Sequence, residues 1–161
     1  MARRSPSAPR IAARTARRRG QWPTERILAE LRRTVRVRRH NVGITLRDAL
    51  MDALVHSQDI AVPLGRDLPL PTDAAAEAAT RVWSVQGSAL STVFRRLPLR
   101  HLRLVATDTD WAVGEGPLVT GPIRALLLLL TGRRVALAHL TGEGADLLKA
   151  HPASAEEARR G

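Results

Sequence analysis

The positive charge of this chain is confined to its first quarter, and this segregation limits where a fold can form. Residues 1–40 contain 13 arginines against Glu25 and Glu30 and carry the whole formal net charge of +11. Residues 41–161 contain 13 basic and 13 acidic groups and are neutral overall. A segment this rich in arginine has little apolar surface to bury. We therefore predict a disordered basic leader over residues 1–22, with the folded part of the chain beyond it.

The composition restricts the core and its chemistry. Hydrophobic residues make up 44% of the chain but aromatic residues only 2%, so the core must consist mainly of Leu, Val and Ala. The absence of cysteine excludes disulfides and thiolate metal ligands. No apolar run approaches the roughly 20 residues that cross a bilayer, and the start lacks the apolar segment of a secretory signal. We expect no membrane association and a cytoplasmic location.

Helical spacing of apolar residues predicts helices over residues 25–37, 46–60 and 72–85. Thr45 is a suitable N-cap for the second of these. The prolines and glycine between residues 63 and 71 mark the clearest boundary in the chain. The predicted apolar stripe of the second helix consists of Leu46, Ala49, Leu50, Ala53, Leu54 and Ile60.

The pattern changes in the second half of the chain. After a weak helical segment at 88–96, alternation predicts short strands over 102–106, 111–113 and 118–119, with a turn at 108–110. Gly121 and Pro122 open a leucine-rich helix that should be buried on several sides and that Gly132 should end. Short helices at 135–140 and 145–149 and a polar tail at 153–161 follow. We predict an α+β fold with a partial helical-bundle segment at 23–65 and an α+β domain at 66–152.

One group of polar residues has spacing that suits metal chemistry. Asp48, Asp52, His56 and Asp59 fall within an arc of roughly 80° on the predicted helix 46–60. Asp52 and His56, one turn apart, could reach one divalent cation such as zinc, and Asp59 could bond the imidazole as a second-shell partner. A solvated helix face is the alternative. Two ligands also fall short of the three that a catalytic zinc site uses.

Two blocks of the sequence resemble one family. The segment Leu54–Gly65 resembles the last bundle helix of the maleylpyruvate isomerase-like, mycothiol-dependent family, which is related to the DinB-like bundles. The segment Leu102–Trp111, then Val113-Gly114, Gly121-Pro122 and the leucine run to Arg133, resembles that family's C-terminal domain. The resemblance implies a four-helix bundle with a divalent metal inside, followed by a small sterol-carrier-like α+β domain. It places the family's carboxylate-x-x-x-His pair on Asp52 and His56.

The chain departs from this family in its first half. Only a two-helix remnant of the bundle is expected, as in a truncated gene product or one with a mis-set start, and the metal-binding His of an early helix has no counterpart. Asp52 stands where the best-known member has Glu. A remnant of this kind leaves the stripe around Leu46, Leu50 and Leu54 exposed, and pairing of two copies could rebuild a four-helix arrangement. Exposure of this stripe favours aggregation, dimerisation or docking on the C-terminal domain, and we take a homodimer as the hypothesis.

Three functions follow from these patterns. The resemblance implies an isomerase or transferase that uses a divalent metal and mycothiol as co-substrate on a small electrophilic substrate, and the missing ligand predicts weak or no activity. The first alternative is non-specific, salt-sensitive nucleic-acid binding through the arginines of the leader, namely Arg3, Arg4, Arg10, Arg14, Arg17, Arg18 and Arg19. The second is a non-catalytic binding domain, in which the C-terminal α+β unit holds an apolar ligand.

Overall fold

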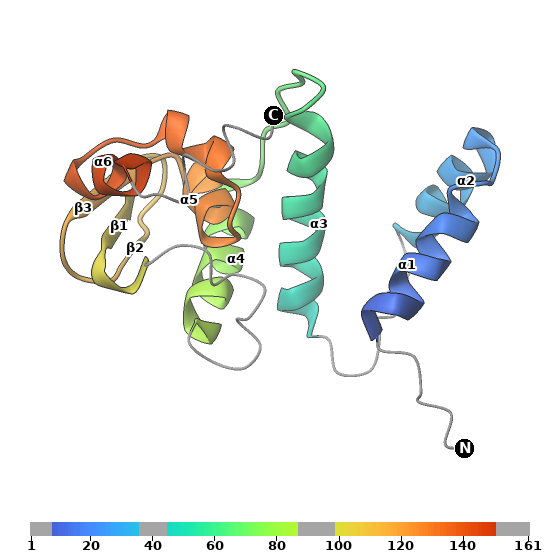
Figure 1. The fold of residues 1–161 in the computed structure, drawn as a ribbon, viewed down its shortest axis with the longest axis horizontal. Coiled ribbons are helices and arrows are strands. Elements are labelled where there is room, and N and C mark those ends of the chain that lie inside the picture. Colours follow the sequence, from blue (N-terminus) through green and yellow to red (C-terminus); the bar gives the residue numbers. More distant parts are fainter. Residues whose placement is uncertain (1–7, 36–44, 87–98, 151–161) are drawn as a thin grey trace, which may run out of the picture. The chain divides into compact units, whose positions relative to one another are not determined.

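The structure, a computed structural model, describes residues 8–35, 45–86 and 99–150 (Figure 1). The chain divides into two compact units, Met1–Arg39 and His40–Gly161. Our predicted boundaries at residues 22, 65 and 152 differ from this division. The predicted helix at 88–96 and the predicted tail at 153–161 lie outside the described residues.

The first unit contains α1 (Ala8–Arg19) and α2 (Thr24–Thr34). The prediction of disorder over residues 1–22 is therefore wrong for Ala8–Arg19. The physical reason is that alanine and arginine, which supply little apolar surface, are among the best helix formers. Arg17, Arg18 and Arg19 also lie in the last turn, where positive charge offsets the negative end of the helix dipole. No described side chain of α1 or α2 is buried.

The second unit begins with α3 (Leu46–Ala61) and α4 (Thr72–Val85), as predicted. A 3-10 turn, η2 (Leu99–His101), then leads into three strands, β1 (Arg103–Ala106), β2 (Ala112–Val113) and β3 (Leu118–Gly121). The chain closes with α5 (Ile123–Leu130), the 3-10 helix η3 (Arg134–His139) and α6 (Glu143–Ala150).

The three strands form one mixed sheet in the order β2-β1-β3. Leu104 on β1 pairs with Val113 in the antiparallel register and with Val119 in the parallel register. The helices are thus followed by a small mixed sheet on which further helices pack. This arrangement confirms the α+β class.

Local signals in the sequence account for the helix boundaries. The side chain of Thr45 caps α3, and Asp48 completes a capping box with it, which confirms the predicted N-cap. Proline precedes the first residue of both α4 and α5. The Asp108 carboxylate accepts a hydrogen bond of 2.7 Å from the backbone N–H of Ile123 at the start of α5. Gly132, at a φ of +83°, ends that helix as predicted.

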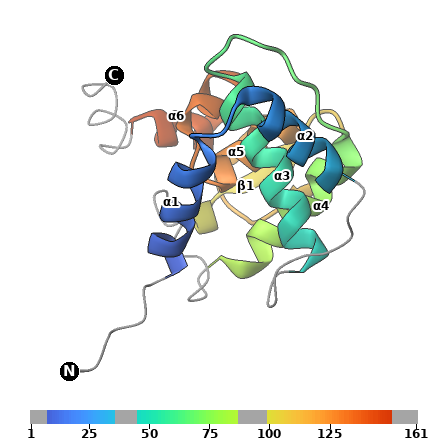
Figure 2. The same cartoon turned by 90° about the vertical axis from the view of Figure 1, so that its right-hand side faces the viewer.

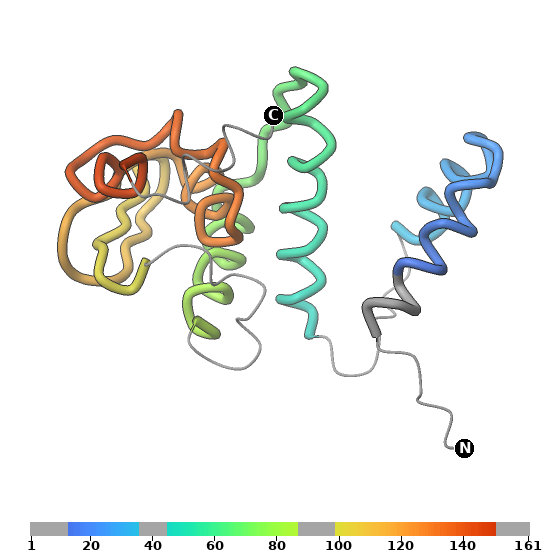
Figure 3. The backbone as a smooth tube through the Cα atoms, in the orientation of Figure 1, coloured from blue at the N-terminus to red at the C-terminus, as the bar shows by residue number. Residues whose placement is uncertain are grey.

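The core of the second unit is built around α5. Every side chain of this helix except Arg124 is buried, which confirms the expectation of a helix covered on several sides. The helix contacts α4, β1, β3 and η3. In turn, α4 contacts α3, which lies beside it in Figure 2. The face of α4 that packs in this way is lined by small side chains, Ala75, Ala78 and Ala79, all fully buried. Figure 3 shows how the chain turns back after α3 through residues 62–71 to reach α4.

The buried face of α3 coincides only in part with the predicted stripe, since Leu54 packs on the core and Ala49 and Leu50 are half-buried. Val55, Gln58 and Ala61 are buried, and Met51 and Leu54 pack partly against the core. Leu46 and Ile60, at the two ends of the predicted stripe, are instead about two-thirds exposed. Both faces of this helix carry apolar residues, so periodicity alone selected the more leucine-rich face. Among the described helices, none is both long enough and apolar enough to cross a membrane.

Gly114 and Gly132 provide a matched test of backbone geometry. Both have positive φ, but a Cβ on Gly114 would overlap the Leu102 carbonyl oxygen and press on Trp83, whereas a Cβ on Gly132 would meet open space. We expect Gly132→Ala to lower the free energy of unfolding by about 1 kcal/mol through backbone strain alone. Gly114→Ala should lower it by about 3 kcal/mol or more, because overpacking is added. Equal losses in urea denaturation would contradict this packing.

Candidate functional site

The polar edge of α3 divides into side chains that are held by the rest of the unit and side chains that are not. Asp48 belongs to the first kind. Its carboxylate bonds the Thr45 backbone N–H at 3.0 Å and the Arg81 guanidinium at 2.8 Å. Arg81, and secondarily Thr45, hold the pKa of this carboxyl well below its usual range. Asp48 therefore caps α3 and links it to α4, so it is committed to the fold.

Asp59 forms the centre of a charged cluster at the other end of α3. Arg133, which follows the end of α5, contacts both of its oxygens, with Nε to Oδ1 at 3.0 Å and Nη2 to Oδ2 at 2.7 Å. His56 Nδ1 lies 2.9 Å from Asp59 Oδ2, so the predicted contact between Asp59 and the imidazole is present. The Arg133 guanidinium is the main cause that lowers the pKa of Asp59.

Asp52, the predicted metal ligand one turn before His56, is exposed. It makes no hydrogen bond or ion pair with any residue that the structure describes. Within the described residues no group of three or more His, Asp and Glu side chains could hold a metal ion. The assignment of Asp52 and His56 as metal ligands, with Asp59 as their second-shell partner, stays a prediction.

The donor set around His56 fits a divalent cation poorly. Carboxylate and imidazole are suitable ligand types, but the predicted pair, Asp52 and His56, supplies only one of each where a catalytic zinc uses three protein ligands. The carboxylate that orients a metal-bound imidazole normally contributes negative charge to the site. Here the charge of Asp59 is neutralised by the two-point contact with Arg133. A cation bound at His56 would therefore have a fixed guanidinium as a near neighbour.

Arg133 is the residue of this cluster that spacing could not reveal. It lies 74 residues from Asp59 in the chain, and only the fold brings the two together. Its position inside the second resemblance block, just after Gly132, was the one available signal. Spacing also could not reveal Arg81, which bonds Asp48 from 33 residues away in the chain.

Other residues of the resemblance blocks have roles in the fold. Asp108 bonds the first turn of α5, and Trp111 Nε1 donates to the Thr80 hydroxyl on α4 at 2.9 Å. A Cβ on Gly121 would press on the His139 carbonyl oxygen at 2.6 Å, so this position needs glycine where β3 passes η3. These residues stabilise the fold, so the candidate site is the cluster at His56.

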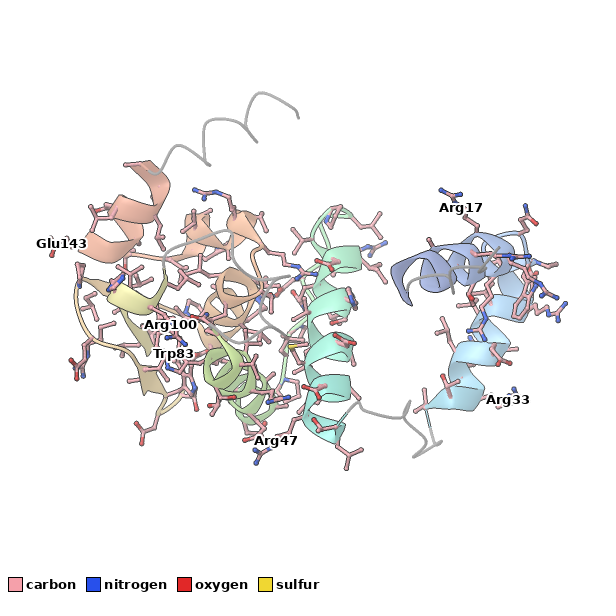
Figure 4. All side chains as sticks on the ribbon, turned by 60° about the horizontal axis from the view of Figure 1, so that its bottom comes forward. Arg17, Arg33, Arg47, Trp83, Arg100 and Glu143 are labelled. Carbon is pink, nitrogen blue, oxygen red and sulfur yellow. The ribbon has the colours of Figure 1, made fainter. Side chains whose placement is uncertain are left out.

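The arginines of the first unit extend from α1 and α2, as Arg17 and Arg33 do in Figure 4. The ring of Trp22 is covered by arginines of its own unit, with the guanidinium carbons of Arg26 and Arg19 lying 4.1 and 5.8 Å from its centroid. This arrangement uses cation–π attraction within the unit and occupies a ring that base stacking would need. Nucleic-acid binding through this segment stays a prediction.

Comparison of the chain with protein-family models, with curated proteins and with solved structures gives no match.

Removal of Arg133 should raise the pKa of Asp59. In Arg133→Met the carboxyl loses its two-point partner, and its pKa should move up toward the ordinary value of about 3.9. A lowered pKa stabilises the fold above the unfolded-state value, and this stabilisation is lost as the pH falls through the folded-state pKa. We expect Arg133→Met to cost about 1 kcal/mol at pH 7, because solvent screens a pair that is one-quarter to one-third exposed.

This difference between wild type and Arg133→Met should begin to shrink below about pH 4, where Asp59 is protonated in the unfolded chain, and should vanish as the pH falls through the lowered pKa of Asp59 in the folded wild type. Carboxyl NMR titration and urea denaturation at pH 7 and pH 3 measure the two effects. Asp52→Asn, which changes an exposed carboxylate on the same helix, is the matched control and should leave both unchanged. A pKa of Asp59 that does not move in Arg133→Met would refute the assignment.

Proposed function

We propose that the second unit is a maleylpyruvate isomerase-like domain that binds a small molecule without metal-dependent catalysis. In this proposal α3 corresponds to the last helix of a DinB-like bundle, and residues 66–152 correspond to the sterol-carrier-like domain. The two resemblance blocks are the basis of this assignment. The packing of α3 and the α+β part into a single unit, in which α5 is buried nearly all round, also supports it.

The chain of contacts from Arg133 through Asp59 to His56 is the observation that carries the non-catalytic part of the proposal. A metal-dependent thiol reaction needs a cation that lowers the pKa of the bound thiol. Arg133 neutralises Asp59 and leaves Asp52 as the unpaired carboxylate of this cluster, so the local attraction for a cation is weaker than two free carboxylates would give. Mycothiol as co-substrate would depend on that cation, so we expect no thiol-dependent isomerase or transferase activity from this chain.

Zinc binding tests the proposal directly. The full chain, expressed with added zinc and dialysed, should contain far less than one zinc per chain by elemental analysis, and calorimetric titration should give no stoichiometric site. Asp52→Ala and His56→Ala should behave like wild type, as should Asp73→Ala, a carboxylate control on α4. About one zinc per chain that Asp52→Ala and His56→Ala lose, and Asp73→Ala keeps, would overturn the proposal in favour of a working metal centre.

The homodimer that the sequence predicts is supported by the outer face of α3. Leu46 and Ile60 lie on one face, at a separation of 14 residues, and are 70% and 67% exposed. Large apolar side chains exposed in line are typical of protein contacts. We expect sedimentation to give a concentration-dependent dimer whose dissociation constant rises tenfold or more in Leu46→Gln with Ile60→Gln.

Leu147→Gln is the control for this experiment, because Leu147 on α6 is 54% exposed but lies away from α3. It should leave the dimer intact. A wild-type chain that sediments as a monomer at all concentrations, or a dimer that the α3 variants leave unchanged, would rule out this interface.

A further inference from the structure

A cavity of about 250 Å³ lies at the C-terminal end of α3, where residues 62–67 pass α5 and η3. Asp52, His56 and Asp59 are not among the residues that line it, so it is separate from the cluster on the outer edge of α3. At about 30 Å³ for each water in the liquid, it has room for roughly eight waters. That volume suits a ligand smaller than a typical drug molecule.

The inner wall of the cavity is apolar. Ala125 and Leu128 from α5 and Ala136 from η3 line it and are otherwise buried in the core. Val62, at the end of α3, adds a further apolar contact. A wall of this kind favours a ligand with an aliphatic or aromatic body, because binding removes that body and the wall from water.

The mouth of the cavity is positively charged. The lining includes Arg66 and Asp67, both exposed to solvent, and the half-buried Arg124, so we take their side of the cavity as its mouth, and His139 lines the cavity from η3. Arg124 Nη1 bonds Asp67 Oδ1 at 2.7 Å, but the Asp67 side chain is 82% exposed. Ion pairs this exposed contribute little to stability. A ligand carboxylate can therefore take the place of Asp67 at the Arg124 guanidinium.

A buried amide completes the wall. Gln58 is only 2% exposed, and its Nε2 donates to the Leu68 carbonyl at 2.8 Å, which fixes the orientation of the side chain. Its Oε1 accepts no hydrogen bond from a described residue. One fixed polar group in an apolar wall is the arrangement by which small-molecule sites orient their ligands.

We propose that this cavity binds a small monocarboxylate of about ten non-hydrogen atoms in all, most of them in an apolar body. The carboxylate meets Arg124 and Arg66 at the mouth, and the apolar body lies against Ala125 and Leu128. The Gln58 carbonyl oxygen accepts a hydrogen bond where the ligand offers a hydroxyl or amide donor. This inference rests on the proposed role of the second unit in binding a small molecule, and it names the class of ligand.

The test is titration of the ¹⁵N-labelled full chain with benzoate, with benzyl alcohol as an uncharged probe of the same shape. Benzoate should give saturable shifts confined to residues around the cavity, and benzyl alcohol should bind at least tenfold more weakly. Arg124→Gln should weaken benzoate binding about tenfold or more, and Arg66→Gln by a smaller factor. Ala125→Met, which fills the apolar end, should abolish binding.

Arg103→Gln is the matched control, because Arg103 is an exposed arginine on β1 outside the cavity. It should leave benzoate binding unchanged, and thermal unfolding should verify that each variant folds. Three results would each overturn the assignment: no saturable shifts at the cavity, equal binding of benzyl alcohol, or equal losses in Arg103→Gln and Arg124→Gln.

Failure here is distinguishable from failure of the proposed function. Stoichiometric zinc on Asp52 and His56 with benzoate still bound at the cavity would remove the non-catalytic assignment and leave the cavity as a ligand site. A chain without zinc and without benzoate binding would keep the non-metal conclusion and remove this ligand class.

Discussion

The burial of α5 is the constraint on which the rest of the second unit depends. A helix with seven buried side chains out of eight needs cover on almost every side. The alanine face of α4, the sheet and η3 supply that cover, and α3 packs in turn on α4. Arg124, the one polar side chain of α5, marks the side where the helix reaches solvent, and that side is the mouth of the cavity. The cavity thus lies beside Arg124, the one charged residue of an otherwise apolar helix.

Local sequence signals predicted most of the elements but not their faces. Thr45, Pro122 and Gly132 determine helix ends through hydrogen bonds and backbone angles within a few residues, so the sequence alone was sufficient for them. The burial of α3 depends on which face α4 meets, and both faces are apolar enough to compete. The helix α1 was missed because low hydrophobicity indicates the absence of a core, whereas helix formation also depends on backbone propensity.

The candidate site illustrates the same limit at longer range. The contact between His56 and Asp59 lies within one helix, and its spacing predicted it. Arg133 neutralises Asp59 and so changes the charge of this pair, but it lies 74 residues further along the chain. Spacing alone selected Asp52, His56 and Asp59 as a possible metal site. The charge around them also depends on the contact between Arg133 and Asp59, which only the tertiary fold creates.

The two polar regions near the end of α3 share one electrostatic character. At the outer edge, Arg133 neutralises the carboxylate that would otherwise favour a cation beside His56. At the cavity, Arg66 and Arg124 outnumber Asp67, whose exposed side chain is readily displaced. The carbonyl end of α3 carries partial negative charge, which arginines at this end offset. In both regions an arginine thus offsets carboxylate charge close to the end of α3, and the Arg133–Asp59 contact also holds this end of the helix on the rest of the unit.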